Sequence, residues 1–118
     1  MVNRLDRVNS QIQKAISESI IYELQNPKIK SSLITVSKVD VSADFSHAKV
    51  FVSIFPDKVK EEVFNALKTC VPFLRKEVAR KVQLRITPEL HLFIDNSEEY
   101  ASKIDNLLNK ISEGKKND

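Results

Sequence analysis

The residues best suited to chemistry in this sequence are cations, and they are concentrated in one segment. Between positions 75 and 85 there is one acid, Glu77, and a local net charge of +4, carried by Arg75, Lys76, Arg80, Lys81 and Arg85. The whole chain of 118 residues has a net charge of only +3, so the remainder is slightly acidic. Clustered arginine and lysine attract a phosphate backbone. We therefore predict a nucleic-acid contact here, with an ordinary solvated helix face as the alternative.

No catalytic or metal-binding motif accompanies these cations. The residues His47, His91 and Cys70 lie far apart in the sequence and lack the spacing of a zinc motif. The single glycine, Gly114, lies in a polar tail, whereas a phosphate-binding loop needs several glycines. No order of Ser, His and Asp resembles a nucleophile elbow. We therefore expect no enzyme, no metal site and no cofactor, and we interpret His91 as a surface residue of a strand.

Composition predicts one soluble domain. Apolar residues make up 42% of the chain and charged residues 30%, and 118 residues are enough for one core. No apolar run approaches the roughly 20 residues that a membrane helix needs. The N-terminus lacks the apolar region of a secretory signal, and a single cysteine suits a reducing compartment. We expect a cytoplasmic protein without a membrane segment.

Apolar residues spaced by threes and fours predict a long helix over residues 3–25. Its stripe consists of Leu5, Val8, Ile12, Ile16, Ile20 and Leu24. Asn3 can cap the start, and the proline at position 27 should end the helix. The cations at the N-terminal part of this helix form a second, weaker candidate patch, for which an ordinary solvated helix face is the favoured interpretation. The patch consists of Arg4, Arg7 and Lys14.

Three strands are predicted, at residues 33–41, 48–55 and 89–95. The middle one alternates most regularly between apolar and polar residues. In the first, the alternation changes phase, so that Ile34 and Val36 should face one way and Val39 and Val41 the other. We therefore predict a β-bulge near positions 37 and 38.

Two helical segments between the second and third strands should meet at a kink. Helical spacing runs from Val59 to Pro72, and Leu74, Val78 and Val82 form the apolar stripe of the next segment. Proline disturbs a helix interior but suits the first turn, so the kink is predicted at Cys70, Val71 and Pro72. In the second segment Lys76 and Arg80 should project away from the stripe.

The predicted order is α-β-β-α-kink-α-β, followed by a terminal helix. This order predicts an α+β domain with a three-stranded sheet, arranged as in a type II KH-like domain. KH domains hold nucleotides with a GxxG loop, and this sequence has no glycine at that place, so contacts to nucleic acid should come from side-chain charge. We predict that residues 1–96 form the RNA-binding domain, that 97–111 form its C-terminal helix, and that 112–118 form a disordered tail.

Four segments resemble the ribosome-binding factor A family of bacterial small-subunit assembly factors. They are NRLDRVNSQIQKAIS (Asn3–Ser17), TVSKVDVSADFSHAKVFVS (Thr35–Ser53), FLRKEVARKVQLRITPELHLFID (Phe73–Asp95) and SEEYASKIDNLL (Ser97–Leu108). Together they cover nearly the whole chain in order. The family usually has an alanine-x-glycine kink between its central helices. The matching positions here are Cys70, Val71 and Pro72, so proline should keep the kink in place of glycine.

The resemblance implies a non-enzymatic, monomeric cytoplasmic protein. Members of the family bind the free 30S ribosomal subunit, contact 16S ribosomal RNA, and assist late maturation of its 5′ end, notably in the cold. An assembly GTPase helps to release them. Two alternatives remain open from the residues alone: a generic KH-like binder of single-stranded nucleic acid, and a protein-interaction module. The latter would use the apolar stripe over residues 100–111 or the sheet face with Phe51, Phe55 and Phe93.

Overall fold

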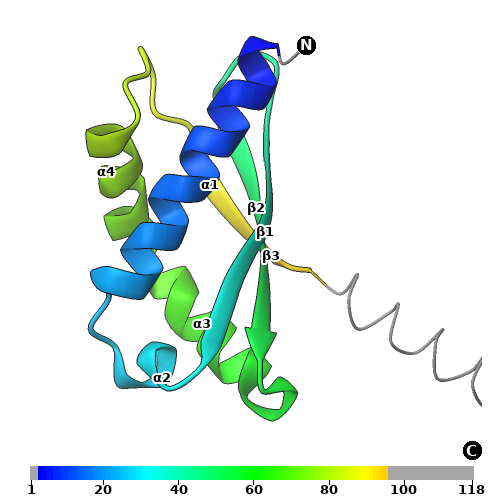
Figure 1. Cartoon of the computed structure of the whole chain (residues 1–118), viewed down its shortest axis with the longest axis vertical. Helices are drawn as coiled ribbons and strands as arrows, with labels where there is room; N and C mark the ends of the chain where they lie inside the picture. The colour runs from blue at the N-terminus through cyan, green and yellow to red at the C-terminus, as the bar shows by residue number, and fades with distance from the viewer. Residues whose placement is uncertain (1–2, 96–118) are drawn as a thin grey trace, which may run out of the picture.

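A computed structural model describes residues 3–95 as two layers, a three-stranded sheet and a set of helices that cover one of its faces (Figure 1). Apart from one short helix and one 3₁₀ turn, the elements follow the expected order α-β-β-α-α-β, and the prediction of a KH-like α+β domain with a three-stranded sheet is confirmed. Among the described residues, no helix has both the length and the hydropathy of a membrane span. The predicted C-terminal helix and tail, 97–118, lie outside the described residues.

Helix α1 spans Arg4–Tyr22 and starts as predicted. The Oδ1 atom of Asn3 accepts a hydrogen bond of 2.8 Å from the backbone N–H of Asp6, which caps the first turn. The predicted end at residue 25 is wrong, because the helix stops three residues earlier and Leu24 reaches the core from the turn that follows. A short helix that the sequence pattern did not predict, α2, then spans Pro27–Lys30.

The sheet has strand order β1-β2-β3, with β1 at Leu33–Val41, β2 at His47–Phe55 and β3 at Glu89–Ile94. Strands β1 and β2 are antiparallel, whereas β2 and β3 are parallel. All four apolar residues that alternate along β2 are buried against the helices. They are Ala48, Val50, Val52 and Ile54.

The predicted bulge in β1 is confirmed by a register shift between Val36 and Lys38. The prediction that the two apolar pairs of β1 face opposite ways is wrong. The extra residue, Ser37, restores the phase, so that Val36 and Val39 are both buried on the helix side. The bulge thus explains why the apolar residues change phase along the sequence although they lie on the same face of the sheet.

Two side chains of α1 form hydrogen bonds with the backbone of β1. The amide Nε2 of Gln13 donates to the carbonyl of Val36 at 2.8 Å, next to the bulge. The Oδ1 atom of Asn9 accepts from the backbone N–H of Val41 at 2.9 Å. These bonds set the N-terminal end of α1 beside the loop that joins β1 and β2 (Figure 1).

The two central helices meet where the sequence predicted. A 3₁₀ turn at Asp57–Val59 leads into α3, Lys60–Thr69, and α4 spans Val71–Lys81. Pro72 occupies the first turn of α4, where its missing N–H is not needed, and Cys70 between the helices is half-buried. The stripe on α4 is buried as predicted and consists of Leu74, Val78 and Val82. The opposite side of α4 is therefore exposed.

Candidate nucleic-acid interface

The five cations predicted as one cluster lie on α4 and, for Arg85, in the connection to β3, and they have different surroundings in the fold. Two of them, Arg80 and Lys81, form ion pairs with acids. Arg80 Nη2 lies 2.6 Å from Glu77 Oε1 and 3.3 Å from Glu23 Oε2. Lys81 Nζ lies 2.8 Å from Glu23 Oε1 and 3.9 Å from Glu18 Oε1. The charges of Arg80 and Lys81 are therefore largely neutralised within the domain.

These contacts shift the pKa values of Glu23 and Arg80. The hydrogen bond from Lys81, with a further one from Ser19, lowers the pKa of Glu23. The hydrogen bond to Glu77 raises the pKa of Arg80 above its ordinary value. The sequence shows one acid within the basic segment, Glu77, and the fold adds a second acidic partner, Glu23, from the residue that follows α1. The two partners Lys81 and Glu23 are 58 positions apart, and no local pattern brings them together.

A third cation, Arg75, holds the segment between α4 and β3. Its Nη2 atom donates to the carbonyl of Thr87 at 2.7 Å, and its Nε atom donates to the carbonyl of Pro88 at 3.1 Å. These two carbonyls lie just before β3, outside the strand ladder. Arg75 therefore positions the connection at residues 82–88. Its guanidinium group forms no ion pair with a carboxylate of residues 3–95.

The remaining cation within the helix, Lys76, is exposed and borders a hollow of about 470 Å³. Its lining comes from the outer side of α4 and from the α4–β3 connection. The lining residues are Pro72, Arg75, Lys76, Ala79 and Thr87. No carboxylate pairs with Lys76 within residues 3–95, so its ammonium group is available to an external anion.

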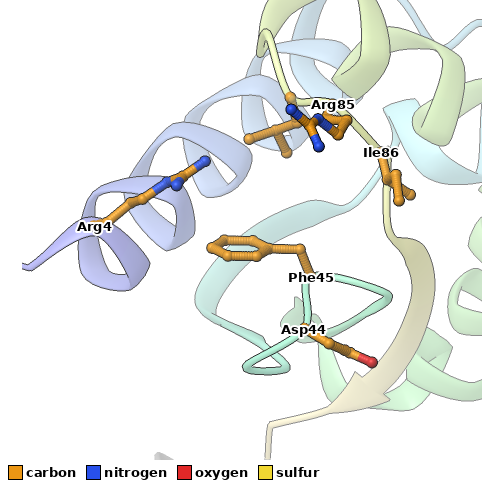
Figure 2. Close-up of a pocket in the computed structure, with 6 residues that line it drawn as sticks. Arg4, Asp44, Phe45, Arg85 and Ile86 are labelled. Atoms are coloured by element: carbon orange, nitrogen blue, oxygen red, sulfur yellow. The ribbon is translucent and has the colours of Figure 1, made fainter.

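A second hollow, of about 340 Å³, is lined by one cation from each of the two basic patches that the sequence predicted separately (Figure 2). Arg4 contributes from the start of α1 and Arg85 from the α4–β3 connection, and both are exposed. The two arginines and the Phe45 ring line the same hollow (Figure 2). Neither guanidinium has an ion pair in the described part of the chain. Two unpaired arginines beside an aromatic ring form an arrangement suited to a phosphate and an adjoining base.

Phe45 was missed by the sequence analysis. Its ring centroid lies 5.3 Å from Arg4 Cζ, a cation–π contact. Its backbone has φ of 62°, a left-handed conformation that is uncommon for a residue other than glycine. The only signal in the sequence was a strand connection without glycine, which gave no reason to single out the phenylalanine.

Asp44 organises the loop that holds Phe45. Its Oδ1 atom accepts hydrogen bonds from the hydroxyl groups of Ser42 and Ser46, each at 2.7 Å, and from the backbone N–H of Ser46 at 3.1 Å. These bonds, that from the Ser46 hydroxyl foremost, lower the pKa of Asp44 to about 2. The carboxylate points away from Arg4 and Arg85 (Figure 2), so it shapes the hollow without neutralising the two arginines.

Arg7 and Lys14 are exposed on α1, and neither lines the two hollows described above. They have no carboxylate partner among residues 3–95. The structure thus brings Arg4 next to Arg85 but leaves Arg7 and Lys14 further along α1. Their role in RNA binding stays a prediction.

The other face of the sheet is the rival docking surface named from the sequence. Phe51 and Phe93 stack there with ring centroids 5.5 Å apart, and Lys38 Nζ lies 5.9 Å from the centroid of Phe51. Phe55 is exposed at the end of the same strand, β2. An aromatic pair beside a lysine suits either a base or an apolar side chain, so this face does not by itself distinguish the two alternatives.

Comparison with known proteins gives a consistent result. A family model described as Ribosome-binding factor A matches residues 4–108. A protein named ribosome-binding factor A from Clostridium botulinum (strain Loch Maree / Type A3) is 45% identical over 116 residues, which is 98% of this chain and 96% of that protein. The crystal structure of ribosome-binding factor A from Thermus thermophilus is similar with a TM-score of 0.68 at 28% identity, covering 78% of this chain and 97% of that one. A homology model of the Thermus thermophilus factor, fitted into a cryo-electron microscopy map of a 30S complex, gives a TM-score of 0.59 at 28% identity, covering 75% of this chain and 91% of that one.

Proposed function

The chain belongs to the ribosome-binding factor A family, and we propose on that premise that it binds the free 30S ribosomal subunit through 16S ribosomal RNA. The observation that carries the proposal is the family match over residues 4–108. Further support comes from the similarity of the fold to a homologous chain fitted into a 30S complex.

The surface on both sides of the α4–β3 connection is the proposed RNA contact. Arg4, Lys76 and Arg85 would bind phosphates directly, since none of them is paired with a carboxylate of residues 3–95. Arg7 and Lys14 would extend the contact along α1, and Arg75 would hold the connection in place. Arg80 and Lys81 would reach RNA only by giving up the carboxylates that they now contact. Charge from side chains thus replaces the glycine loop of an ordinary KH domain.

The role in the cell that fits this activity is assistance in late assembly. We propose that the protein promotes maturation of the 5′ end of 16S ribosomal RNA, notably in the cold, and that an assembly GTPase helps to release it. It would act as a cytoplasmic monomer by binding and not by catalysis, with residues 1–96 as the RNA-binding domain, 97–111 as its C-terminal helix and 112–118 as a disordered tail. Membership of a family of ribosome-binding factors supports this role.

Co-sedimentation on a sucrose gradient tests the proposal. The protein should travel with free small subunits and not with complete ribosomes. If roughly four to six phosphates are contacted, the slope of log affinity against log salt should be about −3 to −5, at 0.7–0.9 for each contact. A slope near zero would mean that contacts to ribosomal proteins dominate. Equal affinity for short single-stranded RNA would instead favour the generic KH-like binder.

A further inference from the structure

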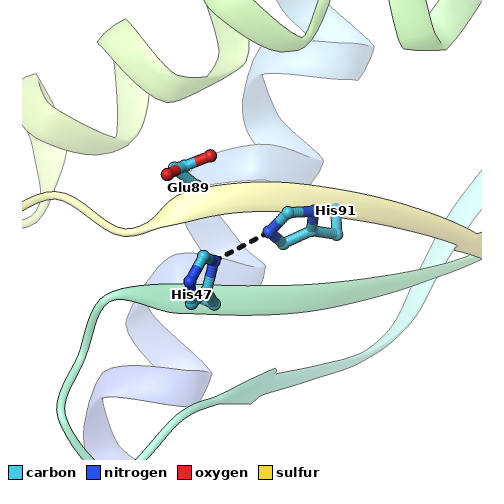
Figure 3. Close-up of side chains that lie close together, drawn as sticks. All are labelled: His47, Glu89 and His91. Atoms are coloured by element: carbon cyan, nitrogen blue, oxygen red, sulfur yellow. Dashed lines mark hydrogen bonds between the residues drawn. The ribbon is translucent and has the colours of Figure 1, made fainter.

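Three side chains with metal-binding atoms meet on the outer face of the sheet, where β2 and β3 run in parallel. In this ladder His47 is opposite Glu89, and Lys49 is opposite His91. Residues two positions apart on a strand point to the same side. The register therefore places His47, Glu89 and His91 together on one exposed surface, away from the helices (Figure 3).

The distances between these side chains are close to those that a metal ion requires. His47 Nδ1 lies 2.9 Å from His91 Nε2, and the two ring centroids are 5.1 Å apart. One ligand atom from each of the three residues can be chosen so that all lie within 4.8 Å of one another. Zinc–nitrogen bonds of about 2.0–2.1 Å separate two tetrahedral ligand atoms by about 3.3 Å. The three side chains are exposed, so binding an ion would require them to rotate from the present spacing to about 3.3 Å.

Regular backbone structure on both strands supports the placement of the three residues. The backbone N–H of Glu89 donates to the carbonyl of Ser46 at 2.9 Å, which fixes the start of β3 against β2. The backbone N–H of His47 in turn donates to the hydroxyl of Ser42 at 3.1 Å. Sites on strands hold their side chains more closely than sites on loops do.

We propose that His47, Glu89 and His91 bind one divalent transition-metal ion of the zinc class. Two imidazole nitrogens and a carboxylate oxygen form a donor set that suits zinc and neighbouring metals, whereas magnesium and calcium prefer oxygen ligands alone. Three protein ligands leave at least one coordination position for water or another oxygen donor. The spacing of ligands along the sequence predicted no metal site, because the two histidines are 44 positions apart and meet only in the sheet. The inference does not depend on the proposed RNA contact.

The test uses the full chain without an affinity tag. Titration with Co²⁺, followed by visible absorption, and with Zn²⁺, followed by calorimetry, should give one ion per chain. The variants Glu89→Gln and His91→Gln should each weaken binding about tenfold or more. The matched control is Cys70→Ser, which removes the only thiol of the chain from a position between α3 and α4. It should bind the ion as the unmodified protein does.

Thermal melts would check that each variant is folded, which is expected because the two substituted ligands are exposed. An independent readout is the nuclear magnetic resonance spectrum of the unmodified protein, in which Zn²⁺ should shift the ring signals of both His47 and His91. Absence of saturable binding would overturn the proposal. So would unchanged affinity in His91→Gln, or loss of binding in Cys70→Ser.

Discussion

Replacing Lys76 and Arg85 together by alanine tests whether the two hollows beside the α4–β3 connection contact RNA. Both side chains are exposed, and neither has a carboxylate partner among residues 3–95. Surface changes of this kind usually alter the free energy of unfolding by no more than about 0.5 kcal/mol each. The double variant should therefore melt close to the unmodified protein.

The loss of affinity for the 30S subunit can be worked out from counterion release. Each phosphate contact contributes about 0.7–0.9 to the slope of log affinity against log salt. Taking 1 M salt as the reference at which this contribution vanishes, one contact is worth about 5–8-fold in affinity at 0.1 M salt. Loss of two contacts should therefore weaken binding about 25–60-fold at 0.1 M and make the slope less steep by about 1.4–1.8.

The assay is co-sedimentation with purified small subunits at several salt concentrations, beside a thermal melt. The matched control is Lys30→Ala with Lys58→Ala, which removes the same charge from exposed positions in α2 and in the turn before α3. The control should keep the original slope. If the control loses as much affinity as the double variant, net charge and not location is responsible. If the folded Lys76 and Arg85 variant keeps its slope, these residues do not contact RNA.

Three further predictions concern neighbouring residues. Arg80→Ala should lower Tm more than Lys76→Ala does, because Arg80, unlike Lys76, pairs with Glu77 and Glu23; equal melting temperatures would contradict this. Pro72→Ala should reduce stability by roughly 0.4–1 kcal/mol through greater freedom of the unfolded chain. The same variant should weaken binding to the small subunit by more than this loss of stability explains, since Pro72 lines the hollow beside Lys76. Asp44 has a pKa lowered from 3.8 to about 2, so its contribution to stability is complete above pH 3.8 and is lost as the pH falls through about 2. An Asp44→Asn variant should lack that change in an acid titration followed by thermal melts.

Local patterns in the sequence were sufficient to predict most of the fold. The change of phase in the apolar alternation of β1 predicted the bulge, and the position of Pro72 predicted the junction of α3 and α4. The end of α1 could not be predicted in the same way. Leu24 continues the helical stripe and is buried, but it reaches the core after the helix has ended. Burial alone does not distinguish a helical residue from one in the turn that follows.

The candidate interface was predictable in its residue types but not in its charge balance. The +4 segment is a fact of the sequence, whereas the pairing of Lys81 with Glu23 depends on how α1 packs beside α4. The same applies to Arg4 and Arg85, which lie near opposite ends of the described chain and meet around Phe45. Contacts between residues remote in sequence follow from the fold and leave no periodic signal.

Arg75 shows why charge alone is a poor guide to which cations bind RNA. Its guanidinium group is charged and exposed, yet two of its donors hold the carbonyls of Thr87 and Pro88. The segment held in this way carries Arg85. Loss of Arg75 would therefore weaken RNA binding by displacing another cation, even if Arg75 itself touched no phosphate. A cation that positions the surface and a cation that contacts the ligand can thus give the same loss of affinity. They differ in the salt slope, because only a lost phosphate contact removes its own share of counterion release.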